Sequence, residues 1–222
     1  MSNQAVDKVG HWQTVCDDWG DDKQAFKVHW GKFMMWIFLV SDTFIFSCFL
    51  VGYMKVRMTV TDPWPFPSEV FALTLFGNSI PLILIAIMTF ILITSSGTMA
   101  LAVRFSHFRD KKRIAQFMFI TAAFGASFVG MQAFEWSKLI AEGVRPWVNP
   151  FGAPQFGSVF FMITGFHGLH VSIGVIYLIT VAMKILKGHY DKTDYEIVEI
   201  AGLYWHFVDL VWVFIFAFFY LW

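Results

Sequence analysis

Five long apolar stretches constrain the fold of this chain more than any other feature. Each can cross the hydrocarbon core of a bilayer, about 30 Å thick, which takes roughly 20 helical residues. Hydrophobic residues make up 57% of the 222 residues and charged residues only 14%, which is too apolar for an ordinary soluble domain. We predict an all-α, polytopic membrane bundle whose five transmembrane helices span residues 30–54, 80–103, 114–137, 156–184 and 197–222.

The segments outside these stretches are expected to be a tail and loops. Residues 1–28 are polar and acidic and lack the pattern of a signal peptide, so we expect an N-terminal tail at 1–28 and one transmembrane domain at 29–222. Pro81 is placed in the first turn of the second helix, where its missing N–H costs nothing. Cys16 in the tail and Cys48 in a helix are not expected to form a disulfide.

Lys and Arg residues predict the orientation of the chain. With the N-terminus inside and the C-terminus outside, twelve of the 16 Lys and Arg residues lie on the inner side, as the positive-inside rule requires. The outer interface then holds four tryptophans, Trp64, Trp136, Trp147 and Trp222. At the inner boundary, Arg104 and Arg113 are candidates for binding phospholipid headgroups.

Ionisable residues inside the predicted helices are the candidate functional residues, because such groups are costly in a membrane and usually mark a partner, a pathway or a ligand. Counting 1.5 Å per residue places several of them at similar depth near the middle of the bilayer. We expect one buried polar network made of Asp42, His167, His170, His206 and Asp209. Two interpretations stay open: hydrogen bonds that hold helices together, and a direct role with protons or a ligand.

The third and fourth helices carry further candidates. Gln132 and Glu135 are three residues apart and share a face, but Glu135 lies near the outer end of its helix and is expected to be exposed at the interface. Small residues at helical spacing predict tight packing between these two helices. They are Ala122, Ala126 and Gly130 on the third helix, and Gly165, Gly168 and Ser172 on the fourth.

The ligand inventory argues against a redox centre. His167 and His170 share a helix face, but haem and copper sites need several ligands, and too few histidines lie inside the spans. No nucleotide-binding loop or hydrolase motif occurs in the sequence. We therefore expect no catalytic residue, no metal and no cofactor in this chain. Its formal net charge of zero gives no sign of nucleic-acid binding.

Three motifs stand out within the helices: FFMITGFHGLHV at 160–171, YWHFVDLVW at 204–212 and QAFEW at 132–136. With these motifs, residues 28–222 resemble subunit III of the haem–copper terminal oxidases, also called the cytochrome c oxidase subunit 3 family. Ser41-Asp42 and Ser96-Gly97 add weaker support. The residues that carry the motifs are Gln132, Glu135, Trp136, Thr164, Gly165, Gly168, Tyr204 and Trp205.

The resemblance implies a non-catalytic subunit of a respiratory enzyme in the bacterial cytoplasmic (inner) membrane. The haems and copper would lie in the partner subunits, chiefly in subunit I, and subunit I would bind this chain directly. Subunit II and other respiratory complexes would be further partners. The implied role is to support subunit I stability, proton uptake, and lipid and oxygen access while O2 reduction in aerobic electron transport drives proton translocation. Bound phospholipids are also implied.

The chain departs from the longer family members, which have seven helices. It resembles a short, five-helix bacterial form, with Asp42 where long forms usually have glutamate and Arg104-Phe105 where they have a histidine pair. Because QAFEW and GFHG look like the long forms, we expect an aa3-type cytochrome c oxidase. A quinol oxidase subunit III and a nitric-oxide reductase accessory subunit are alternatives, as are a stand-alone proton channel and a membrane haem-binding protein.

Overall fold

The spanning part of the protein is a bundle of five helices. The computed structural model describes residues 30–75, 78–190 and 195–221. Within them, five helices are long and apolar enough to cross a membrane, as predicted. They are α2 (Trp30–Thr59), α4 (Ile83–His107), α5 (Lys111–Ala141), α6 (Gln155–Leu186) and α7 (Glu196–Phe216), with α7 continued by the π-helical turn η1 (Ala217–Leu221). The predicted tail, with Cys16, lies outside the described residues, as does Trp222.

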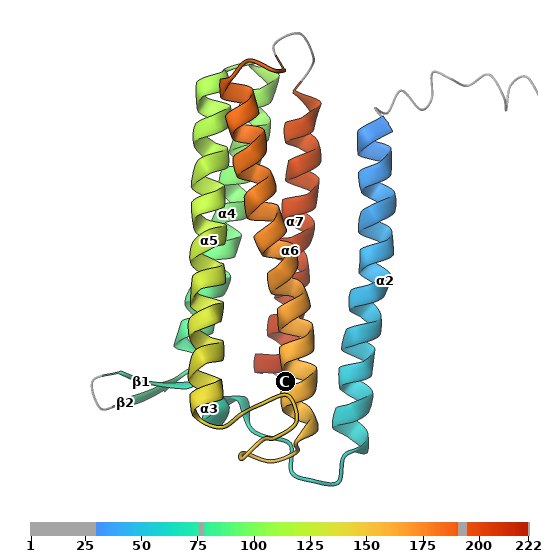
Figure 1. Cartoon of the computed structure of the whole chain (residues 1–222), viewed down its shortest axis with the longest axis vertical. Helices are drawn as coiled ribbons and strands as arrows, with labels where there is room; N and C mark the ends of the chain where they lie inside the picture. The colour runs from blue at the N-terminus through green and yellow to red at the C-terminus, as the bar shows by residue number, and fades with distance from the viewer. Residues whose placement is uncertain (1–29, 76–77, 191–194, 222) are drawn as a thin grey trace, which may run out of the picture.

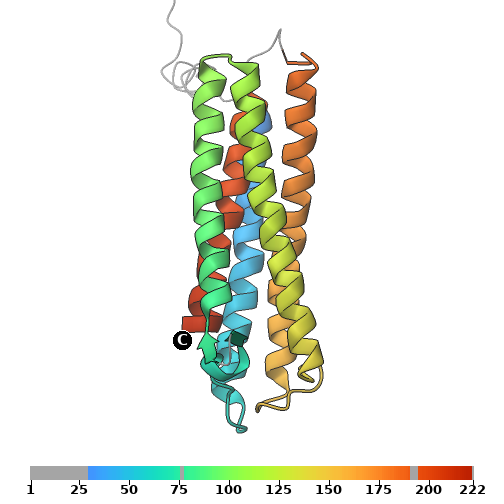
Figure 2. The same cartoon turned by 90° about the vertical axis from the view of Figure 1, so that its left-hand side faces the viewer.

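Successive long helices run in opposite directions, and four of them form a compact group (Figure 1). Helix α5 packs against α4 and α6, and α7 closes the group by packing against both α4 and α6. Helix α2 stands at one edge, where it contacts α7 and α6. Turned by 90°, α4, α5 and α6 lie in front, with α7 and α2 behind them (Figure 2). The start of α2 and the end of α7 lie at opposite ends of the bundle.

Helix α7 is central to the packing. Of its most apolar stretch 56% is buried, compared with 17% for α2. Its two tryptophans, Trp205 and Trp212, are the largest fully buried side chains among the described residues. Gly125 of α5 and Gly174 of α6 make room for Trp205, since an added Cβ on either would contact its ring. Small residues on α5 and α6 therefore accommodate the large residues of α7.

The segment before α4 differs from the prediction. Residues Ala72–Leu75 (β1) and Asn78–Pro81 (β2) form a short antiparallel hairpin that follows the one-turn helix α3 (Pro67–Val70). The prediction that Pro81 lies in the first turn of a helix is wrong, because Pro81 ends β2, where a residue without an N–H is tolerated. Leu82 then turns the chain with a positive φ of 62°, and α4 begins at Ile83.

Candidate functional site

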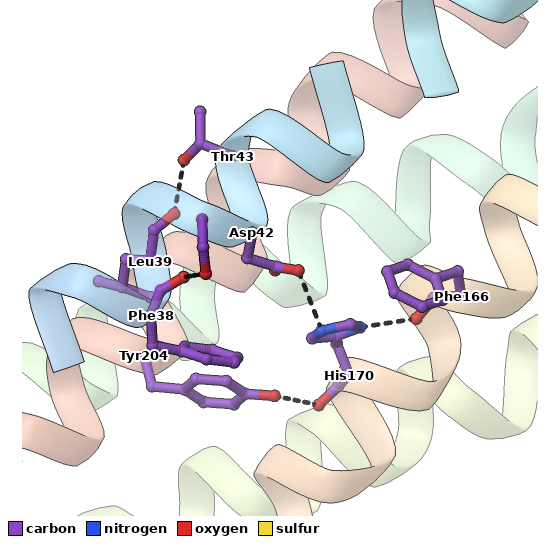
Figure 3. Close-up of polar contacts among 8 residues, drawn as sticks. Phe38, Leu39, Asp42, Thr43, Phe166, His170 and Tyr204 are labelled. Atoms are coloured by element: carbon purple, nitrogen blue, oxygen red, sulfur yellow. Dashed lines mark hydrogen bonds and ion pairs between the residues drawn. The ribbon is translucent and has the colours of Figure 1, made fainter. Parts of the chain in front are cut away.

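Asp42 of α2 is buried and pairs with a histidine of α6 (Figure 3). The Nε2 atom of His170 lies 3.4 Å from Oδ1 of Asp42. The other ring nitrogen, Nδ1, is 2.8 Å from the carbonyl oxygen of Phe166. Because a carbonyl oxygen only accepts hydrogen bonds, Nδ1 carries a proton and donates it. The hydroxyl of Tyr204 donates to the carbonyl oxygen of His170 at 2.9 Å, which brings α7 to the same place.

This geometry fixes how the pair can hold protons. With Nδ1 protonated, a hydrogen bond between Nε2 and Asp42 requires one proton between them, carried either by the imidazole as imidazolium or by the carboxyl group as carboxylic acid. Both forms are neutral overall, so neither leaves an isolated charge inside the membrane, which would be very unfavourable. The second carboxyl oxygen of Asp42, Oδ2, has no hydrogen-bond partner among the described residues. The arrangement can hold one proton or tie α2 to α6.

A second polar cluster lies between α4 and α7. The hydroxyl of Ser96 is 2.6 Å from Nδ1 of His206, and Ser96 also interacts with the carboxyl group of Asp209. His206 and Asp209 are three residues apart and so lie on one face of α7, the face that meets α4. Unlike Asp42, both side chains are partly exposed.

His167 forms no hydrogen bond with either cluster. It is completely buried, stacks on Trp212 with ring centroids 5.3 Å apart, and meets the ring of Phe128 edge-on. Neither ring nitrogen has a hydrogen-bond partner among the described residues. The residues predicted as one network thus fall into three groups, because α7 presents Tyr204 towards α2 and α6 but His206 towards α4.

The motif residues of α5 and α6 lie against each other. Nε2 of Gln132 donates to the carbonyl oxygen of Thr164 at 2.8 Å. A Cβ on Gly168 would lie 3.0 Å from Oε1 of Gln132, and one on Gly165 would lie 2.9 Å from the ring of Trp136. Glycine at both positions therefore lets the larger side chains of α5 lie against α6, as the predicted close packing requires.

The small residues predicted on α5 do not all face a neighbour. Ala122 is buried, but Ala126 and Gly130 are exposed, and a Cβ on Gly130 would meet nothing within 4 Å. The physical reason is that a spacing of four residues advances about 40° around the helix at each step. The row therefore turns away from the contact within two steps.

Glu135 is buried, so the prediction that it is exposed at the interface is wrong. Only 4% of its surface is accessible, and the hydroxyl of Tyr220 donates to its Oε2 atom at 3.3 Å. The sequence position near the outer end of α5 was misleading, because Tyr220 of η1, at the end of α7, reaches Glu135. Nothing near Glu135 in the sequence points to a partner 85 residues away.

Two polar contacts on α7 were not predicted. The indole N–H of Trp205 donates to the hydroxyl of Ser95, and that of Trp212 donates to the hydroxyl of Thr89, both at 3.0 Å. The similar spacing, seven residues between the tryptophans of α7 and six between Thr89 and Ser95 of α4, was the available signal, since each tryptophan needs an acceptor when it is buried. These bonds join the two helices that also carry Ser96 and His206.

The predicted headgroup candidates lie where α4 meets α5. Arg104 and Arg113 are both exposed, and the guanidinium of Arg113 pairs with Asp110 at 3.1 Å and lies over the ring of Phe105. Of the predicted interface tryptophans, Trp147 is 76% exposed, whereas Trp64 and Trp136 are partly buried. Within residues 30–75, 78–190 and 195–221, no three His, Cys, Asp or Glu residues are grouped so that they could hold a metal ion.

The fold and these clusters define a multi-pass helical membrane protein with ionisable residues paired between its helices. The sequence model of the family "Cytochrome c oxidase subunit III" matches residues 16–222, and the chain belongs to this family. A "Probable quinol oxidase subunit 3" of Staphylococcus aureus (strain USA300) is 31% identical over 196 residues, covering 88% of this chain and 90% of the relative. One from Staphylococcus saprophyticus is 29% identical with the same coverage.

Membership confirms the resemblance to subunit III of the haem–copper oxidases. It makes the chain a subunit of a terminal oxidase complex, which associates with other oxidase subunits in a membrane. The expectation of an aa3-type cytochrome c oxidase is not settled by these matches, because the relatives above are named for quinol oxidases and the family is named for cytochrome c oxidase.

Proposed function

We propose that this chain is a non-redox accessory subunit of a haem–copper terminal oxidase in a bacterial cytoplasmic membrane. The family match over residues 16–222 carries the proposal. In this role the chain binds subunit I directly, keeps it stable, and supports proton uptake and lipid and oxygen access during turnover. The haems and copper belong to partner subunits, with subunit II in the same complex. The buried Asp42–His170 pair supports a role in proton uptake and not in the catalysis of O2 reduction.

The experiment is purification through an affinity tag on this chain, followed by mass spectrometry and an optical spectrum. We expect a larger haem-bearing partner in stoichiometric amount, with O2 reduction by the complex. Dissociating this chain should then leave the haems in the partner and the isolated chain without a Soret band or stoichiometric copper or iron. A haem retained by the isolated chain would contradict the accessory role, and purification without a haem-bearing partner would favour a stand-alone proton channel.

We propose a quinol as the electron donor of the complex. The names of the relatives from the two Staphylococcus species favour it, and cytochrome c is the second candidate because of the QAFEW and GFHG motifs. Oxygen consumption by the purified complex should be faster with a reduced quinol than with reduced cytochrome c. The reverse result would assign the complex to the cytochrome c oxidases, and nitric oxide consumption without O2 reduction would assign it to the nitric-oxide reductases.

A further inference from the structure

The cluster of Ser96, His206 and Asp209 is unusual because it is partly exposed at the middle of the membrane. Ser96 lies near the midpoint of α4, and Asp209 near the midpoint of the span formed by α7 and η1. With a rise of about 1.5 Å per residue, both are about 20 Å from the start of their helices. All three side chains have partial solvent access in the described structure. Part of each residue is therefore exposed at the depth where lipid is most apolar.

Lipid is a poor neighbour for these groups. Ionisable side chains within membrane spans almost always face protein or a water-filled cavity, because hydrocarbon offers neither hydrogen bonds nor charge compensation. The Oδ1 atom of Asp209 is itself buried and has no hydrogen-bond partner among the described residues, so the partial exposure of Asp209 comes from its other atoms. Phospholipid headgroups are about 15 Å from the bilayer centre. The exposed part of this cluster therefore needs a protein neighbour or a water-filled cavity at this depth.

The surface beside the cluster is shaped for a close neighbour. Gly97 and Ala100 of α4 are exposed, and a Cβ added to Gly97 would meet no atom within 4 Å. Ile93 of α4 and Val213 of α7 flank them and are 54% and 41% exposed. Small residues at a helix surface let a second backbone approach closely, which is how transmembrane helices gain packing energy without a hydrophobic driving force.

Other exposed faces of the bundle lack this combination. The outer face of α6 presents apolar residues such as Ile173 and Ile176, which suit lipid. The groove of about 560 Å³ between α2 and α7 is lined by apolar and hydroxyl side chains, with no ionisable residue. Asp209 and His206 lie outside that groove, on the side of α7 that meets α4.

We propose that the α4–α7 face, formed by Ile93, Gly97, Ala100, His206, Asp209 and Val213, is the docking surface for a transmembrane helix of the catalytic subunit. That helix lies across Gly97 and Ala100 and covers the exposed parts of His206 and Asp209. The inference rests on the proposed function and assigns to it the surface that binds subunit I.

Blocking the surface without disturbing the bundle tests the proposal. Gly97→Trp fills open space in the docking surface, and Gly130→Trp fills equally open space on α5 as the matched control. With an affinity tag on the catalytic subunit, we expect Gly97→Trp to lower the amount of this chain per haem at least fivefold, and Gly130→Trp to keep it within twofold of wild type. Equal retention of both variants would overturn the docking surface. If the wild-type chain itself did not copurify with the tagged catalytic subunit, the proposed function would be contradicted instead.

Two further measurements distinguish a protein partner from lipid. A photoreactive residue at Val213 should form an adduct with the catalytic subunit, and one at Ile176 should not. Adducts at Val213 with lipid alone, or with a second copy of this chain, would overturn the proposal. Asp209→Leu should also weaken retention several-fold while Asp209→Asn, which still accepts a hydrogen bond, preserves it. Better retention with leucine would show that this position faces lipid.

Discussion

Asp42 connects the edge helix α2 to α6 through its contact with His170. Asp42→Asn keeps the shape and can donate its amide proton to Nε2 of His170, so the helix contact should survive while the shared proton is lost. Asp42→Leu instead leaves His170 without its partner, and breaking a buried pair in this way costs roughly 3–5 kcal/mol. We expect the asparagine complex to assemble with substantial initial turnover but altered inactivation or pH dependence, and the leucine complex to lose thermal stability.

The two variants separate a structural role from a proton role. Initial O2 consumption, its decay over repeated turnovers and the melting temperature of the complex are measured for both. If Asp42→Asn abolishes the first turnovers while the haems of subunit I stay intact, Asp42 belongs to the obligatory proton path and the accessory assignment is wrong. If both variants melt like wild type, the pair does not hold α2 in place.

At the scale of helices, the contact between α5 and α6 depends on glycine. Gly168→Leu would push a side chain into Gln132, whose Oε1 is already 3.0 Å from the Cβ position, and overpacking of this kind typically costs about 1–3 kcal/mol. Gly130→Leu is the control, since it adds the same side chain in open space. We expect less assembled complex on a native gel with Gly168→Leu only. Equal amounts of assembled complex for both variants would mean that α5 and α6 can move apart without loss of assembly.

The helices also show what sequence can predict. The five spans were predictable because each needs a long apolar run, and the close packing of α5 on α6 was predictable from small residues such as Gly165 and Gly168. Contacts that depend on how α7 is rotated about its axis were not predictable. His206 pairs with Ser96 of α4, whereas Tyr204, two residues earlier, bonds to α6. The burial of Glu135 could not be predicted without the position of η1. The hairpin formed by 72–75 and 78–81 was missed because its sequence resembles the apolar start of a helix.

At the scale of the whole molecule, orientation links all of these sites to the two sides of the membrane. We infer from the Lys and Arg distribution that the connection between α4 and α5 is inside and the connection between α5 and α6 is outside. With Cys16 and Cys48 replaced by serine, single cysteines at the exposed positions Lys112 and Val148 report these two sides. An impermeant maleimide should label Val148→Cys in intact spheroplasts and Lys112→Cys only after permeabilisation.

This orientation decides which compartment each buried acid is near. Glu135 lies in the half of α5 that leads to the α5–α6 connection, so labelling of Val148→Cys from outside would place the Glu135–Tyr220 pair in the outer half of the membrane. Glu199, which pairs with Lys32 at the opposite end of the bundle, would then lie at the inner surface. Labelling of Lys112→Cys in intact spheroplasts would reverse both assignments, and proton uptake along this subunit would then start at the end of the bundle that holds Glu135.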